Sequence, residues 1–263
     1  MANENAKLFV THEGGVKRIT FNRPERRNSI DFEMFALLRE AISESADDES
    51  RVVILTGAGD SFCAGADLAA ASGADLASFD VTAHVREQIS PAILAMRDLP
   101  KPIIARVHGH CVGIGFSYAL ASDIVIASEA AVFSQSFIRI GLMPDGGSTY
   151  FLPRLVGYAK SFELMSTGAQ LSAQEAHALG LVNHVVPFTE LDATVDALAA
   201  QLAAQPQPAL SRIKAALNRD TRAELAAALD FEAVGQHDCF HSPDFHEGVT
   251  AFIQKRKPVF GKK

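Results

Sequence analysis

Short apolar runs alternate with helix-like segments through the middle of the chain, and this alternation constrains the fold most. Residues 51–56 and 101–107 read as buried strands, because both are largely apolar and rich in Val and Ile. A third strand is predicted at 123–127, and helices are predicted at 82–97 and 113–121. Strands that alternate with helices predict an α/β fold in which right-handed crossovers join the strands of a parallel sheet.

The two ends of the chain depart from this alternation. Alternating residues on either side of Glu13-Gly14-Gly15 predict an opening hairpin, and Asp31 is the predicted N-cap of a helix through Ser43. The Ala/Ser/Gly/Asp-rich stretch 69–80 is predicted as a flexible loop. Beyond Pro187 the pattern is helical only, with helices expected at 190–204, 208–218, 221–239 and 244–256. The Gln-Pro-Gln-Pro break divides the chain into an α/β core, residues 1–204, and a helical C-terminal region, residues 205–263.

Composition restricts the class of protein. The 263 residues are 48% hydrophobic and 21% charged, which is typical of a globular enzyme. The net charge of −7 repels nucleic acid and anionic membranes, so neither is an expected partner. The basic cluster at 255–257 runs against this trend, either as a solvated tail or as a phosphate site. The longest mostly apolar run is too short to cross a bilayer, no secretory signal is visible, and the three cysteines form no C-x-x-C pair. We therefore expect a reduced, cytoplasmic protein.

Two glycine-containing segments and one acid carry the functional signal. The segments 62–68 and 108–115 place glycines where backbone N–H groups can point at an anion. Asp145 stands between Pro144 and a Gly-Gly-Ser-Thr run, at a predicted helix start. One acid that faces two amide donors suffices for enolate chemistry. The same residues also have a structural interpretation, with the glycines needed for tight packing and Asp145 acting as an N-cap.

Other chemistries fit the sequence less well. Gly113-Ile114-Gly115 lacks the third small residue and the later acid of a dinucleotide fingerprint, and no P-loop motif occurs. His108-x-His110 and His237-x-x-x-His241 lack the partner pattern of a metal site, so no metal is expected. Ser117 has no nucleophile-elbow context and is expected to be a packed helix residue.

The chain resembles the enoyl-CoA hydratase/isomerase (crotonase) superfamily over nearly its whole length. Motifs in the family's order carry the resemblance, at residues 22–28, 62–68, 108–115, 141–149, 171–176 with 180–182, and 247–257. The resemblance implies a crotonase-like spiral of ββα turns whose C-terminal helices form a homotrimer, often doubled to a hexamer. It implies an acyl-CoA substrate and no separate cofactor. The C-terminal region carries an apolar stripe, including Leu225, Leu229 and Phe240, that one subunit is not expected to bury alone.

The resemblance also implies roles for individual residues. The thioester oxygen would accept hydrogen bonds from the backbone N–H groups of Ala66 and Ile114. The family usually has glycine where Ile114 stands, so Ile114 would narrow the acyl pocket without removing the donor. Phe137 and Leu142 would line the acyl pocket. The implied substrate- and CoA-binding residues are Arg27, Ala64, Asp67, Leu68, Phe252 and Lys255.

The residues at the positions of the family's catalytic acids indicate the type of reaction. Hydratases of this family use two glutamates, which would fall at Ser117 and Phe137 here, whereas Asp145 stands where some isomerases carry their acid. The motifs are most similar to the single-Asp enoyl-CoA isomerases of phenylacetate breakdown. We therefore expect a double-bond isomerase whose base is Asp145, kept ionised by the helix start. The alternatives are a hydratase, lyase or hydrolase that uses Asp145 alone, a dehalogenase whose branch carries a tryptophan absent here, and a non-catalytic RNA-binding relative.

Overall fold

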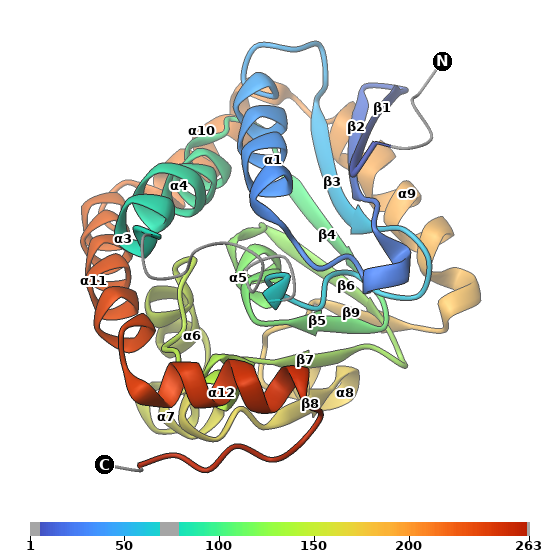
Figure 1. The fold of residues 1–263 in the computed structure, drawn as a ribbon. Coiled ribbons are helices and arrows are strands. Elements are labelled where there is room, and N and C mark those ends of the chain that lie inside the picture. Colours follow the sequence, from blue (N-terminus) through green and yellow to red (C-terminus); the bar gives the residue numbers. More distant parts are fainter. Residues whose placement is uncertain (1–5, 69–78, 262–263) are drawn as a thin grey trace.

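The computed structural model describes residues 6–68 and 79–261, and most of the loop predicted at 69–80 lies outside them. In this part of the chain a six-stranded sheet has the order β1-β2-β3-β4-β6-β9 (Figure 1). Its strands are Leu8–Glu13 (β1), Val16–Phe21 (β2), Val52–Gly57 (β3), Ile103–Val107 (β4), Ile124–Ser128 (β6) and His184–Val186 (β9). β1 and β2 pair antiparallel, and every later pair of neighbours is parallel. The predicted hairpin and the predicted parallel α/β sheet are confirmed.

A second, three-stranded sheet brings the two glycine-containing segments together. It consists of β5 (His110–Val112), β7 (Val132–Ser134) and β8 (Gln170–Ser172), in the order β5-β7-β8. The chain runs from β4 into β5 and then into helix α5 (Ile114–Ala121), and likewise from β6 into β7. In the pairs β4–β5 and β6–β7 the first strand therefore lies in the large sheet and the second in the small sheet, as expected for ββα turns. An isolated bridge between Cys63 and Cys111 places the segment 62–68 beside β5.

Local sequence explains where the earlier helices begin and change. α1 (Phe32–Glu44) begins after Asp31, whose carboxylate accepts the Met34 N–H at 3.0 Å, so the predicted cap is confirmed. The helix predicted at 82–97 consists of α3 (Val81–His84), a π-helical turn (Val85–Ile89) and α4 (Ser90–Asp98). The π turn forms here because Pro91 has no N–H for an ordinary helical bond and its ring crowds the carbonyl four residues earlier. The remaining elements before β9 are η1 (Pro24–Arg26), η3 (Ser136–Ile140), α6 (Ser148–Val156), α7 (Tyr158–Thr167) and α8 (Ala173–Ala178).

The chain after β9 is helical in the described residues, as predicted. Its helices are α9 (Phe188–Ala204), α10 (Gln207–Asn218), α11 (Arg222–Phe240) and α12 (Pro243–Ile253). α9 covers one face of the large sheet, where Leu191 and Val195 pack with Ile54 and Ile126. α11 and α12 contribute to the hydrophobic cluster on the opposite side. The helical region is thus packed on the α/β core, and the division at residue 205 stays a prediction. None of these helices, within the described ranges, is both long and apolar enough to span a membrane.

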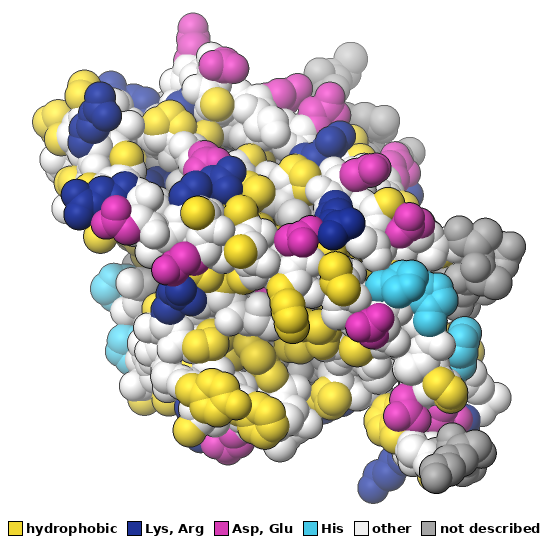
Figure 2. All heavy atoms as spheres, turned by 90° about the vertical axis from the view of Figure 1, so that its left-hand side faces the viewer, with side chains coloured by type: hydrophobic (Ala, Val, Ile, Leu, Met, Phe, Trp, Pro, Cys, Tyr) yellow, Lys and Arg dark blue, Asp and Glu magenta, His cyan; other side chains and the backbone are white. Residues whose placement is uncertain are grey.

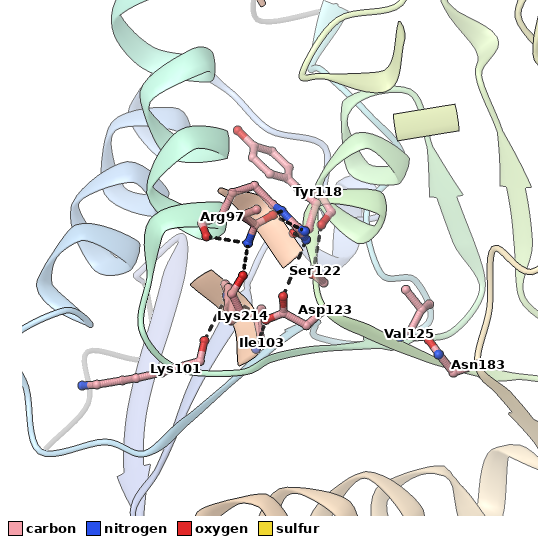
Figure 3. A network of polar contacts seen from close by, with 11 residues as sticks. Arg97, Lys101, Ile103, Tyr118, Ser122, Asp123, Val125, Asn183 and Lys214 are labelled. Carbon is pink, nitrogen blue, oxygen red and sulfur yellow. Dashed lines mark hydrogen bonds and ion pairs between the residues drawn. The ribbon is translucent and has the colours of Figure 1, made fainter. Parts of the chain in front are cut away.

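A partly buried ion pair fastens α10 to the sheet (Figure 3). The Lys214 ammonium lies 2.7 Å from the Asp123 carboxylate and donates a second hydrogen bond to the Lys101 carbonyl oxygen. The same carboxylate accepts the Ile103 N–H at the start of β4. Burial lowers the pKa of Lys214, and the charge of Asp123 opposes that shift. The pair therefore joins a C-terminal helix to the edge of the α/β core through charge as well as packing.

We expect Lys214→Ala to lower the free energy of unfolding by about 2 kcal/mol, because it leaves the partly buried Asp123 carboxylate with only its longer contact to Arg97 Nη1, at 3.6 Å. Arg212→Ala, an exposed site on the same helix, is the matched control and should change stability by less than about 0.5 kcal/mol. Urea unfolding at one fixed protein concentration measures both. Equal midpoints for the two variants would show that the ion pair does not anchor α10.

Candidate active site

The two glycine-containing segments lie against each other, backbone to backbone. Val112 N–H donates to the Cys63 carbonyl oxygen at 2.9 Å. A Cβ atom on Gly65 would lie 3.3 Å from the Val112 carbonyl oxygen, and one on Gly113 would lie 3.7 Å from the Gly65 Cα. Both residues have positive φ, 104° and 56°, a backbone conformation that favours glycine.

This arrangement leaves two backbone amides without a partner in the part of the chain that the structure describes. Ile114 is the first residue of α5, where an N–H has no partner within the helix. Among the described residues, neither the Ile114 N–H nor the Ala66 N–H donates a hydrogen bond, although the N–H groups of Cys63, Ala64 and Asp67 all do. The two unpaired amides are therefore available to a ligand.

A cavity of about 700 Å³ gathers the predicted site residues. Its wall includes Arg27, Ala64, Ala66, Asp67, Leu68, Ile114, Phe137, Leu142, Asp145 and Phe252. Lys255 does not belong to the wall; it is exposed, in the turn after α12. Its contact with CoA stays a prediction.

Asp145 belongs to the loop that precedes α6, and this loop packs on the first turn of α5. The Ser117 hydroxyl of α5 donates to the Asp145 carbonyl oxygen at 2.8 Å. A Cβ atom on Gly146 would lie 2.8 Å from the Ser117 Cβ atom, and φ is 65°, so this position favours glycine. The acid is thereby held beside the helix that begins with one of the unpaired amides.

The structural interpretation of Asp145 as a helix N-cap is wrong. The N-cap of α6 is Gly147, with φ of 79°, and the Asp145 side chain does not bond to the helix start. Its Oδ2 atom accepts the Gln236 Nε2–H at 2.8 Å, whereas Oδ1 is buried without a partner in the described part of the chain. The carboxyl group is therefore free on one oxygen.

The expectation that a helix start keeps Asp145 ionised is also wrong in its direction. Burial, followed by the nearby charge of Glu232, raises the pKa of Asp145 to about 7, and the hydrogen bond from Gln236 acts against them. A buried carboxyl is costly to ionise, because water is replaced by a medium that stabilises charge poorly. An acid with this pKa can both accept and return a proton near neutral pH.

Glu232 on α11 does the capping that was assigned to Asp145. Its carboxylate accepts the Gly147 N–H at 2.8 Å and the Thr149 N–H at 2.9 Å, and it is fully buried. Sequence reasoning missed this residue and Gln236. Their spacing of four residues puts them on one face of α11, but the pattern does not show that this face turns toward Asp145.

The other polar candidates have structural partners. The Asp67 carboxylate lies 2.6 Å from Arg23 Nη2. The Arg27 carbonyl oxygen accepts the Ala64 N–H at 3.0 Å. The Nη1 atom of the Arg27 side chain lies 3.4 Å from His110 Nε2 at the cavity. Ser117 is buried, and its Oγ also lies 2.7 Å from the Ser148 hydroxyl, as expected of a packed helix residue.

The histidine pairs do not form a metal centre in the described residues, where no cluster of three His, Cys, Asp or Glu side chains could hold an ion. His108 Nδ1 lies 2.8 Å from Arg106 Nη1, and its Nε2 lies 2.8 Å from the Gly59 carbonyl oxygen. His241 Nδ1 lies 2.8 Å from the His237 carbonyl oxygen. These side chains are engaged in holding local structure.

Comparison with known proteins agrees with this site. The model of the enoyl-CoA hydratase/isomerase family matches residues 11–263. The chain is 41% identical to the 1,2-epoxyphenylacetyl-CoA isomerase of Escherichia coli, over 98% of this chain and 99% of that protein.

Solved structures agree as well. The crystal structure of an enoyl-CoA hydratase from Mycobacterium avium subsp. paratuberculosis is similar with a TM-score of 0.89 at 38% identity, covering 98% of this chain and 99% of that one. An enoyl-CoA hydratase/isomerase from Pseudoalteromonas atlantica is similar with a TM-score of 0.88 at 31% identity, covering 97% and 100%. The crotonase-like architecture is thereby confirmed.

Proposed function

This chain belongs to the enoyl-CoA hydratase/isomerase family, and from that premise we propose that it is an acyl-CoA isomerase that shifts a carbon–carbon double bond. The observation that carries the proposal is one buried carboxyl group with a free oxygen, held beside two unpaired backbone amides. This set provides one proton carrier and one site for a developing oxyanion. Enolate chemistry requires no more.

The proposed reaction moves one proton between two carbons. Asp145 removes a proton from the carbon α to the thioester of a 3-enoyl-CoA, and the electron pair moves onto the thioester oxygen. The N–H groups of Ala66 and Ile114 donate to that oxygen and hold the dienolate. Asp145 then returns the proton to the γ carbon, which leaves a 2-enoyl-CoA. No redox cofactor takes part in this proposal, because substrate and product have the same oxidation state, and the two N–H groups stabilise the oxyanion in place of a metal ion.

A hydratase is the competing proposal, since one similar solved structure is that of an enoyl-CoA hydratase. Addition of water by the family's two-glutamate route needs two carboxylates, and Ser117 and Phe137 stand at those positions. The Ser117 hydroxyl is bonded to the Asp145 carbonyl oxygen and to Ser148, so it does not substitute for an acid. These contacts favour the isomerase.

Incubation of 2-enoyl- and 3-enoyl-CoA with the protein in D₂O, followed by chromatography and mass spectrometry, tests the proposal. Isomerisation interconverts the two substrates, with at most an exchange of hydrogen for deuterium. Hydration adds the mass of one D₂O molecule. A product that carries added D₂O, formed without interconversion of the enoyl isomers, would overturn the isomerase in favour of the hydratase.

A cluster of aromatic side chains in the cavity wall supports a ring-derived acyl group. Phe32, Phe35 and Phe79 surround the His84 ring, with centroids 5.0–5.5 Å from it, and all four side chains line the cavity. Burial lowers the pKa of His84 to about 4, so its ring is neutral at pH 7. Aromatic walls pack well on flat rings, and the similar E. coli protein is named for an epoxyphenylacetyl substrate.

We also propose a homotrimer or hexamer. Leu225, Leu229 and Phe240 are buried within the chain, so the expectation that they lie at subunit contacts is wrong. The exposed apolar side chains are others, among them Ile213 and Leu217 on α10 and Phe231 and Val234 on α11. Figure 2 shows hydrophobic side chains interspersed with charged ones on the α11 side of the molecule.

Subunit contacts that cover these side chains would remove apolar surface from water. We expect light scattering to give the mass of three or six chains, and Phe231→Glu to shift it toward one chain. Glu224→Gln, which removes an exposed charge from the same helix, is the control and should leave the mass unchanged. A monomeric mass for the unmodified protein would contradict the assembly.

A further inference from the structure

We propose that α11 supplies two positioning residues to Asp145: Gln236 leaves Oδ1 as the proton-carrying oxygen, and Glu232 holds the loop and charge environment in which it works. The inference rests on the proposed function and adds residues outside the family motifs that carried the sequence interpretation. Gln236 and Glu232 both form hydrogen bonds with the loop 143–149.

The orientation of the Gln236 amide follows from its partners. Its Nε2 atom donates to Asp145 Oδ2 at 2.8 Å and to the Met143 carbonyl oxygen at 2.9 Å. Both partners are acceptors, so the atom facing them is the nitrogen. Gln236 is 2% exposed, which leaves the amide little freedom to turn.

This contact makes the two oxygens of Asp145 unequal. A proton on Oδ2 would face an N–H donor, whereas a proton on Oδ1 would not. Oδ1 is buried without a partner in the described residues, and the side chains of Asp145 and Gln236 both line the cavity. Gln236 can therefore keep its hydrogen bond to Oδ2 in both charge states of Asp145, while Oδ1 gains and loses the proton.

Glu232 acts on the same loop from one helical turn earlier. Its carboxylate takes the Gly147 and Thr149 N–H groups and also accepts the Thr149 hydroxyl. These bonds fix the residues that follow Asp145 and place a second buried acid near it. The charge of Glu232 raises the pKa of Asp145, and the Gln236 hydrogen bond lowers it. Two residues one turn apart on α11 therefore shift the pKa of Asp145 in opposite directions.

Other titratable groups lie near Asp145 or in the wall of the same cavity. From α5, Tyr118 lies close enough that Asp145 contributes to raising the pKa of its hydroxyl. The remaining charged or titratable side chains of the cavity wall are Glu25, Arg26, Arg27, Asp31, Asp67, His84, His110 and Arg139. Asp31 is paired with Lys7, and Asp67 with Arg23. The α11 residues differ from these groups because Gln236 touches the carboxyl itself and Glu232 is the neighbouring acid that shifts its pKa.

The sign of each expected effect follows from the charges. Asp145 acts as a base when ionised, so kcat/KM rises with pH through its pKa. Glu232→Gln removes a like charge and should move this acid limb to lower pH by about one unit. Gln236→Leu removes a donor to the ionised form and should move the limb to higher pH by a similar amount.

The experiment compares pH profiles of kcat/KM for isomerisation in the unmodified protein, Glu232→Gln, Gln236→Leu and Asp230→Asn. Asp230 is an exposed acid on α11, so its variant removes a charge from the same helix without facing Asp145. We expect opposite shifts for the first two variants and none for Asp230→Asn. If kcat/KM rises at the same pH in Glu232→Gln and Gln236→Leu as in the unmodified protein, and only their melting temperatures fall, then both residues serve stability alone and the proposal is overturned.

A second readout separates this inference from the proposed function. Carboxyl ¹³C NMR of aspartate-labelled protein follows the Asp145 titration directly, with the Asp145→Asn variant identifying its resonance. If the unmodified protein never isomerises enoyl-CoA, the proposed function fails, yet the titration must still shift down in Glu232→Gln and up in Gln236→Leu. An Asp145 titration that is the same in all the variants overturns the inference.

Discussion

Asp145→Asn is expected to lower the rate of isomerisation by about 10²–10⁴ while the protein stays folded. The amide cannot accept the substrate proton as a carboxylate does. The side-chain carbonyl oxygen of the new amide can still accept the Gln236 Nε2–H that Asp145 Oδ2 accepts now. No helix cap is lost, because α6 is capped by Glu232 rather than by Asp145.

Steady-state kinetics with 3-enoyl-CoA, circular dichroism and calorimetric titration with CoA measure this prediction. We expect kcat to fall and CoA affinity to stay nearly unchanged, because the carboxyl group is proposed to act on the acyl chain. Asp244→Asn, which replaces an acid in the first turn of α12, is the matched control and should keep the parental rate. A folded Asp145→Asn variant that isomerises at the parental rate would contradict the mechanism.

Ile114→Pro is expected to lower turnover by about 10²–10³, the effect of losing one oxyanion donor. The substitution removes the N–H that is unpaired at the start of α5. Proline is tolerated at the first position of a helix. The residue before it must be extended, and Gly113 has φ of 56° and ψ of −129°, the mirror image of an extended conformation that glycine adopts freely.

Ile114→Val distinguishes the effect of losing the N–H donor from the effect of changing the side chain, because valine keeps the N–H and is smaller by only one methylene. We expect Ile114→Val to stay within a few-fold of the parental rate and Ile114→Pro to show the large loss. Circular dichroism of both variants checks that α5 is intact. Equal turnover of two folded variants would remove Ile114 from the oxyanion hole.

Much of the fold follows from patterns that act over short distances. The glycines at 14 and 15 turn the opening hairpin, Asp31 caps α1, and the apolar runs at 51–56 and 101–107 become β3 and β4. Each of these depends on the backbone preferences and polarity of neighbouring residues. The motifs also pointed to Ala66, Ile114 and Asp145, which the structure places around one cavity.

The character of Asp145 depends on contacts between distant parts of the chain. Sequence context favoured an ionised residue at a helix start, because Gly, Ser and Thr follow it. The N–H groups at the start of α6 donate instead to the carboxylate of Glu232, which comes far later in the chain. Burial raises the pKa of Asp145 to about 7. A local pattern cannot report this, because the cost of ionising a carboxyl depends on what excludes water from it.

The same distinction applies to the C-terminal helices: the sequence predicts where they form, but not which of their faces is buried. Their existence follows from composition and periodicity, and α9 to α12 form where they were predicted. Which side of α11 is buried does not follow, since Leu225, Leu229, Glu232 and Gln236 turn inward while Phe231 is 70% exposed. Helical periodicity determines which residues share a face, but only the packing of α11 against the loop at Asp145 decides which face meets the site.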